Sequence, residues 1–215
     1  MPEYYGTNNV KQILPFLPRR PKWLIVGGPA DSNEAQYLKG KWPDIKIIGI
    51  EPNPEAVEWQ KTVGEWPPDA YLIPSALGDE PGKVMEMIME PGRLHNASLE
   101  PKQVEDNRSN ANAKFLQVTT VTLDGLDSIY GPFEDAVVWM DIEGSEYRAL
   151  QGATNLIKSG RVLLWNIEML NRVPGLMEGV PRLLAEGGYK AVYDWNDSDW
   201  CRDRIFIREG PRFDG

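Results

Sequence analysis

The sequence of 215 residues is short of cysteine and histidine, with Cys201 and His95 the only examples. A single cysteine excludes an internal disulfide framework and a cysteine-based zinc site. A reducing, cytoplasmic compartment is the simplest inference. Basic residues are also in deficit, with 23 Lys and Arg against 32 Asp and Glu and a formal net charge of −9. This balance predicts no nucleic-acid partner and no binding to an anionic membrane.

Long apolar runs are missing as well. No run is long enough to span a bilayer, and the first residues lack the basic and apolar regions of a signal peptide. We therefore expect no membrane insertion. The length fits one α/β domain with a sizeable core. Residues 1–21 are Pro-rich and irregular. We predict that they form an N-terminal extension to a single domain of residues 22–215.

Apolar runs and helical patterns alternate along the chain, which predicts an α/β fold. A helix is expected over Leu176–Glu186, ended by two glycines. Two further strands after this helix are expected to pair antiparallel. The predicted strands are 22–26, 45–50, 70–73, 115–121, 136–140, 161–167, 189–193 and 204–207.

The stretch Val137–Ala153 organises the chain. A buried strand ends in Asp141 and Glu143, and a helix follows with Ser145 placed to cap it. In open α/β sheets, ligands bind at the carboxyl ends of the strands, which makes both acids candidates for chemistry. The alternative is that they only cap the helix and interact with its dipole.

A glycine turn, Gly27-Gly28, follows the first strand, and Glu51 ends the second strand about 20 residues later. An acid at that position can bind both ribose hydroxyls of a nucleoside. A dinucleotide site would need a third glycine near Asp31, and this acid would repel a pyrophosphate. The combination therefore favours a nucleoside without a pyrophosphate. The alternative for Glu51 is a surface acid at a strand end.

Three other segments are expected near this edge. Asp79 follows the third strand and can reach a base edge or simply form a turn. A polar excursion at about 94–114, which contains His95, is expected to cover the site face. The loop between the last two strands brings Trp195 and Trp200 to the same face, or packs them as ordinary hairpin aromatics. Alternating methionines in 84–89 are interpreted as core filler.

The motifs together resemble those of FkbM-type methyltransferases over roughly residues 23–189. The resemblance implies a Rossmann-like, doubly wound, seven-stranded fold with one antiparallel strand near an edge. It also implies S-adenosylmethionine as methyl donor and usually a hydroxyl acceptor on a small molecule or sugar. The matching segments are 50–54, 76–79, 121–124, 140–146, 150–153 and 166–168, and the block Asp-x-Glu-Gly at 141–144 is the most specific. The first motif departs from the family, because Ile25 stands where the family has an acid and Asp31 where it has a glycine.

The resemblance assigns roles to the candidate residues. The predicted catalytic residues are Asp141, Glu143, Glu168 and His95, since a hydroxyl must lose its proton during transfer. The predicted donor-binding residues are Gly27, Gly28, Asp31, Glu51, Pro52, Ala76, Asp79 and Asp141. No metal is predicted, although a variant has Asp141 and Glu168 holding Mg²⁺. Two further functions compete with methyl transfer: an NAD-dependent oxidoreductase and a non-catalytic nucleoside-binding protein.

Overall fold

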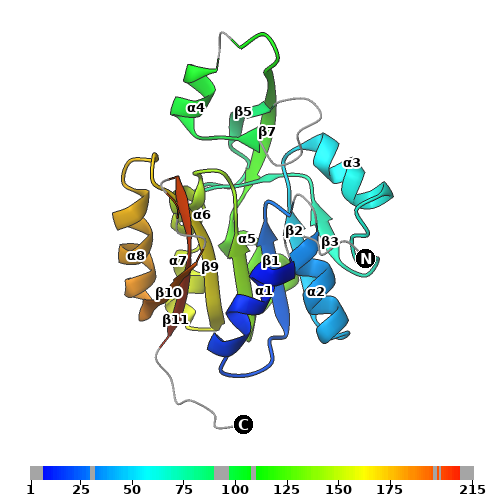
Figure 1. The fold of residues 1–215 in the computed structure, drawn as a ribbon, viewed down its shortest axis with the longest axis vertical. Coiled ribbons are helices and arrows are strands. Elements are labelled where there is room, and N and C mark those ends of the chain that lie inside the picture. Colours follow the sequence, from blue (N-terminus) through cyan, green and yellow to red (C-terminus); the bar gives the residue numbers. More distant parts are fainter. Residues whose placement is uncertain are drawn as a thin grey trace.

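The structure is a computed structural model that describes residues 7–29, 32–89, 97–107, 110–195, 198 and 200–208. Its main element is a seven-stranded sheet with strand order β10-β11-β9-β8-β1-β2-β3 (Figure 1). All neighbours pair in parallel except β11, which runs antiparallel to both β9 and β10. The predicted sheet is therefore confirmed. Its strands are β1 (Trp23–Gly27), β2 (Lys46–Ile50), β3 (Tyr71–Ile73), β8 (Ala136–Met140), β9 (Val162–Leu170), β10 (Tyr189–Trp195) and β11 (Cys201–Arg208).

Helices cover both faces of this sheet. Helix α1 (Thr7–Ile13) and α2 (Asn33–Lys41) pack on one face. The other face carries α5 (Leu123–Tyr130), α6 (Glu146–Gln151), α7 (Thr154–Ser159) and α8 (Leu176–Glu186). Helix α3 (Pro54–Thr62) follows β2, and a short 3₁₀ helix, η1, spans Leu14–Phe16. Val10 and Ile13 of α1 are fully buried, which ties the predicted N-terminal extension to the sheet.

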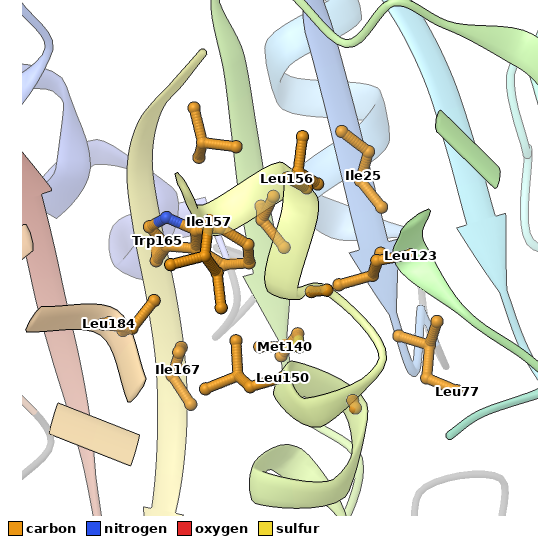
Figure 2. Close-up of a cluster of buried hydrophobic side chains, with 14 of the residues drawn as sticks. Ile25, Leu77, Leu123, Met140, Leu150, Leu156, Ile157, Trp165, Ile167 and Leu184 are labelled. Atoms are coloured by element: carbon orange, nitrogen blue, oxygen red, sulfur yellow. The ribbon is translucent and has the colours of Figure 1, made fainter. Parts of the chain in front are cut away.

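The larger core lies between the sheet and helices α5 to α8. Met140 and Ile167 are fully buried there against Leu150 and Leu156 (Figure 2). Burying one such side chain contributes about 1.5–3 kcal/mol. The continuous burial of β8 explains why its sequence is an unbroken apolar run. The acids that follow Met140 are therefore attached to one of the most firmly held strands of the protein.

A smaller, four-stranded sheet with order β4-β7-β5-β6 projects beyond the carboxyl ends of the main strands (Figure 1). It contains β4 (Ala76–Leu77), β5 (Val84–Met89), β6 (Ala97–Ser98) and β7 (Lys114–Val121), with α4 (Pro101–Asp106) beside it. Met87 and Met89 are buried in its apolar cluster, which confirms the interpretation of the methionines. The excursion expected at 94–114 falls partly outside the described residues. The division into domains remains a prediction.

The helix expected to begin after Ser145 is instead two helices, α6 and α7. The break lies at Gly152, where a Cβ would approach the carbonyl oxygen of Gly78 to 2.1 Å. The regular helix is interrupted there because the second sheet packs against it. Among the described residues, no helix has the length and apolar character needed to cross a membrane.

Candidate active site

The glycine turn joins three strand ends. The carbonyl oxygen of Gly27 accepts a hydrogen bond from the backbone N–H of Asp141 at 3.1 Å, and the N–H of Gly28 donates to Ile50 at 3.0 Å. Gly28 has φ +75°, and a Cβ on it would lie 1.9 Å from the carbonyl oxygen of Asp141. Glycine is therefore required at this position for both conformation and space. Asp31, the predicted partner of this turn, lies outside the described residues.

Glu51 stands next to this turn at the end of β2. The residue is only 4% exposed, and its Oε1 accepts a hydrogen bond from the N–H of Asn53 at 2.8 Å. Burial raises the pKa of Glu51 to about 7, and the charge of Asp141 raises it further against the lowering by that hydrogen bond. Pro52 follows, and Asn53 caps α3 by accepting from the N–H of Glu55 at 3.0 Å. Glu51 is therefore a positioned acid within electrostatic reach of Asp141, not a surface acid.

The turn after β8 is held by Glu146 and not by Ser145. Ser145 makes no side-chain cap, so the predicted capping role is wrong. The Oε1 of Glu146 instead accepts hydrogen bonds from the N–H of Ile142 at 3.0 Å and of Gly144 at 3.2 Å. Glu146 is fully buried, and burial raises its pKa to about 8. Its carboxyl group points back from the start of α6 to the turn. It takes the role that the sequence assigns to the hydroxyl of Ser145.

The same turn places Glu143 in an unusual backbone conformation. Its φ is +54°, in the left-handed region that side chains other than Gly, Asn and Asp rarely adopt. The Oγ of Ser98, on β6 of the second sheet, donates to the carbonyl oxygen of Glu143 at 2.8 Å. Strain of this kind is common at functional sites, where surrounding contacts hold it in place. Here those contacts come from Glu146 on one side and Ser98 on the other.

Three carboxylates meet at the ends of β8 and β9. One oxygen from each of Asp141, Glu143 and Glu168 lies within 4.8 Å of the other two. The structure therefore brings together three of the four predicted catalytic residues. The fourth, His95, lies outside the described residues.

Burial and proximity raise the pKa values of Glu143 and Glu168. Burial raises the pKa of Glu143 to about 7, with Asp141 raising it further and Arg172 lowering it. An Nη atom of Arg172 lies 3.8 Å from Oε2 of Glu143. Burial raises the pKa of Glu168 far above its ordinary value, and the charge of Asp141 and a hydrogen bond to it add to this. Near neutral pH the cluster therefore retains a proton on Glu168 and has a second group poised to titrate, as suits acid–base work.

A polar layer lies beside Glu168 on the same face of the sheet. Asp203 of β11 is its register partner and is 5% exposed. The Oδ1 of Asn166 accepts from Nε1 of Trp195 at 3.0 Å, while its Nδ2 reaches Oδ1 of Asp203 at 3.5 Å. Sequence reasoning missed Asp203. Residues alternate between the two faces along this strand, and Asp203 has the same alternation as Ile205 and Ile207. That pattern predicts that Asp203 lies on the buried face.

The remaining predicted residues occupy other positions. Ala76 is 1% exposed inside the cluster of the second sheet. Asp79 lies exposed beyond β4, with an oxygen 3.7 Å from Nζ of Lys83. Trp195 is packed against Trp139 in the core, so its role is packing. Trp200 is 72% exposed, and its carbonyl oxygen accepts from Asn171 just after β9. Trp200 therefore lies beside the residue that follows β9.

The sequence matches the model of the methyltransferase FkbM domain over residues 30–191. The chain belongs to the FkbM methyltransferase family. The comparison with curated protein sequences gave no match. The resemblance of the motifs is thus confirmed at the level of the family, and methyltransferase chemistry is the activity that the family supports.

Solved structures share the fold of this FkbM domain at low identity. Precorrin-6y C5,15-methyltransferase from Geobacter metallireducens is 10% identical with a TM-score of 0.51, covering 96% of this chain and 90% of that one. A putative RNA methyltransferase from Pyrococcus horikoshii is 11% identical with a TM-score of 0.47, covering 96% and 85%. Fibrillarin from Aeropyrum pernix, with bound S-adenosyl-L-methionine, is 11% identical with a TM-score of 0.48, covering 90% and 69%. These likenesses concern the fold, a Rossmann-like methyltransferase fold.

The expectation that nucleic acid is excluded as a partner is wrong. Proteins of similar fold include one described as a putative RNA methyltransferase. The error has a physical reason. A net charge is a sum over the whole chain, whereas phosphates are bound by local groups of Arg and Lys, which an acidic protein can also carry.

Proposed function

We propose that this protein transfers a methyl group from S-adenosylmethionine to a hydroxyl group of a small molecule or sugar. One observation carries the proposal. The glycine turn joins Asp141 to the end of β2 through backbone hydrogen bonds, so that a nucleoside-type acid and a cluster of three carboxylates share one edge of the sheet. Donor and acceptor can therefore be aligned side by side, which supplies much of the acceleration in group transfer.

The residues near the glycine turn fit the donor. Glu51 offers carboxylate oxygens to the ribose hydroxyls, as acids at the end of a second strand do in nucleoside sites. Asn53 and Ser32 are both fully buried. Among the described residues, Nδ2 of Asn53 and Oγ of Ser32 have no hydrogen-bond partner. Such orphaned groups are costly unless a ligand satisfies them. Gly28 lets the backbone approach closely, and S-adenosylmethionine carries no phosphate that would need a third glycine.

The acid cluster fits the acceptor. When bound, the donor supplies a methyl group on a positively charged sulfur. Asp141 accepts the hydrogen bond of the acceptor hydroxyl and takes its proton as the oxygen bonds to the methyl carbon and the carbon–sulfur bond breaks. Glu143 is the next candidate for this proton, because its pKa of about 7 suits a base near neutral pH. Glu168, which holds its own proton, keeps Asp141 oriented.

Replacing Asp141 by Asn tests the chemistry. We expect Asp141→Asn to bind donor as the wild type does and to lower methyl transfer about 100-fold or more, the size expected for loss of a general base. Asn caps helices nearly as well as Asp, so a purely capping role predicts unchanged activity. Donor affinity, thermal stability and initial rate are measured on one preparation. A wild-type rate at wild-type stability would leave Asp141 as a structural residue.

Replacing Glu51 by Ala tests the donor site. We expect Glu51→Ala to weaken binding of S-adenosylhomocysteine by about 1–3 kcal/mol, measured by calorimetry. Glu58→Ala on the neighbouring helix α3 is the matched control, since Glu58 is exposed. Equal affinities of the two variants would remove Glu51 from the donor site.

A Mg²⁺-dependent version of the reaction is the second candidate. The specific observation in its favour is that the three clustered carboxylates offer oxygen ligands of the kind Mg²⁺ prefers. Dialysis against EDTA separates the two versions. Loss of methyl transfer that Mg²⁺ restores, with donor binding unchanged, supports the metal; an unchanged rate supports a base alone.

An oxidoreductase and a binding protein predict different results from a methyltransferase. An NAD-dependent oxidoreductase predicts tighter calorimetric binding of NAD than of S-adenosylmethionine. A non-catalytic nucleoside-binding protein predicts donor binding without turnover across a panel of acceptors. Mass spectrometry of metabolites and glycans incubated with labelled donor identifies the acceptor. A cytoplasmic location remains a prediction that rests on cysteine usage.

A further inference from the structure

A hollow of about 170 Å³ lies beside α6, at the turn that follows β8. Its walls come from the first residues of α6, the start of α4 and the loop before α8, and include Gly144, Arg148, Gln151 and Glu100. One wall residue, Gly144, directly follows Glu143 of the acid cluster in the chain. No role in the methyl transfer described above uses these wall residues.

Arg148 is the cation of this hollow. It is half-buried, and its Nη1 contacts the sulfur of Met85 at 3.3 Å. Within the described part of the chain, no carboxylate lies at ion-pair distance from Arg148. A thioether is a weak acceptor, and a guanidinium has five N–H donors to satisfy. Other arginines of the protein are differently placed: Arg161 pairs with Asp127, and Arg204 pairs with Asp194.

The hollow is polarised along its length. Glu100 lies at the end near Gly144, since its side chain would contact a Cβ built on that glycine. Arg148 lies four residues further along the chain, on α6. The wall near Gly144 therefore carries the acid Glu100, and the wall along α6 carries the guanidinium of Arg148. Gln151, one further helical step along, adds an amide to the positive end.

We propose that this hollow binds an oxyanion of the acceptor, a carboxylate or a phosphate, through Arg148. The inference rests on the proposed function, and it names the acceptor class as a hydroxyl compound that carries an anionic group. The reacting hydroxyl lies at Asp141 and the anion lies at Arg148. Arg is suited to this role because its planar fork matches the two oxygens of a carboxylate or phosphate.

The experiment measures anion binding and needs no methyl transfer. Inorganic phosphate, acetate, glucose 6-phosphate, glucuronate and glucose are titrated into the full-length protein and followed by NMR. We expect the wild type to bind at least one anion saturably and neutral glucose at least tenfold more weakly. Arg148→Gln should weaken anion binding about tenfold or more, and Arg148→Lys by less. A preference for phosphate compounds or for carboxylates tells a sugar phosphate from a sugar acid.

Arg182→Gln is the matched control. Arg182 is on the neighbouring helix α8 and donates to the hydroxyl of Tyr147 at 3.2 Å, but it does not line the hollow. Its variant should bind anions as the wild type does. All variants are checked for an unchanged thermal midpoint and unchanged affinity for S-adenosylhomocysteine. Absence of saturable anion binding by the wild type, or equal weakening in the Arg148 and Arg182 variants, would overturn the inference.

The two proposals fail in different ways. If S-adenosylhomocysteine binds but anions do not, the anion site is wrong and the proposed function is untouched. If anions bind through Arg148 but S-adenosylhomocysteine does not bind, the proposed function is wrong. The assignment of the acceptor as an anionic hydroxyl compound is then wrong as well.

Discussion

The carboxylate of Glu146 accepts a hydrogen bond from the backbone N–H of Ile142 at 3.0 Å. This contact reaches back across the turn that presents Asp141 and Glu143 at the end of β8. A second bond to Gly144 from the same oxygen fixes the far side of the turn. Glu146 thus determines how the two acids face the site, although it is itself fully buried.

Glu146→Gln and Glu146→Ala should behave differently. Gln keeps an oxygen that can accept both backbone N–H groups, so we expect methyl transfer near that of the wild type, and near-wild-type stability at about pH 4.5, before the pH-dependent loss described below. Ala leaves these donors without a partner and should cost about 2–4 kcal/mol of stability. Denaturant unfolding and initial rates measure the pair of variants. Equal stabilities of the Gln and Ala variants would show that the hydrogen bonds do not hold the turn.

The free energy of unfolding should fall as the pH rises from about 5 to 9. Burial raises the pKa values of Glu51 and Glu143 to about 7 and of Glu146 to about 8, from 4.5. The folded protein therefore binds more protons than the unfolded chain in this window, and stability is lost as pH passes through the folded pKa values. Glu146→Gln should remove the contribution of Glu146 to this pH dependence, which is on the order of 3 kcal/mol of unfolding free energy between pH 5.5 and 8.5. A stability that rises over this range in the wild type would contradict the burial of these acids.

Gly28→Ala should disrupt the site more than Gly82→Ala does. The two glycines have nearly the same φ, +75° and +76°, so the cost of the backbone conformation is matched. A Cβ on Gly82 has no neighbour within 4 Å, whereas on Gly28 it would collide with the carbonyl oxygen of Asp141. We expect about 1–2 kcal/mol for Gly82→Ala, from the left-handed conformation alone, and a larger loss together with weaker donor binding for Gly28→Ala. Thermal unfolding and calorimetry compare them. Identical effects would mean that this close approach relaxes without cost.

Asn166→Leu should destabilise the layer beneath Glu168. The substitution removes the acceptor of the buried N–H of Trp195, which costs about 1–3 kcal/mol. In an Asn166→Leu protein, the further change Trp195→Phe removes that orphaned donor and should cost less than it does in the wild-type background. Denaturant unfolding of the four proteins gives the coupling energy. A coupling near zero would show that this bond adds nothing to the stability of the sheet edge.

The sequence alone determined the main sheet and which acids lie at the ends of its strands. Buried parallel strands are unbroken apolar runs, and the acids that end them stand out, as Glu51 and Asp141 do. The antiparallel pair at the end of the chain was also predictable, because two apolar runs are joined by a short polar loop. These features depend on residues close together in the chain.

Tertiary structure decided the rest. Glu146, and not Ser145, holds the turn, because its fully buried carboxyl group accepts hydrogen bonds from the backbone N–H groups of Ile142 and Gly144 where a local rule predicts a hydroxyl. The helix breaks at Gly152 because Gly78, distant in sequence, approaches it too closely. The pKa of Glu168 on β9 depends on Asp141, which follows β8, and Arg148 lines a hollow whose walls include the start of α4. The contacts of Gly152 with Gly78, of Glu168 with Asp141 and of Arg148 with Met85 join residues far apart in the chain, and no local pattern of residue types encodes which of them will meet.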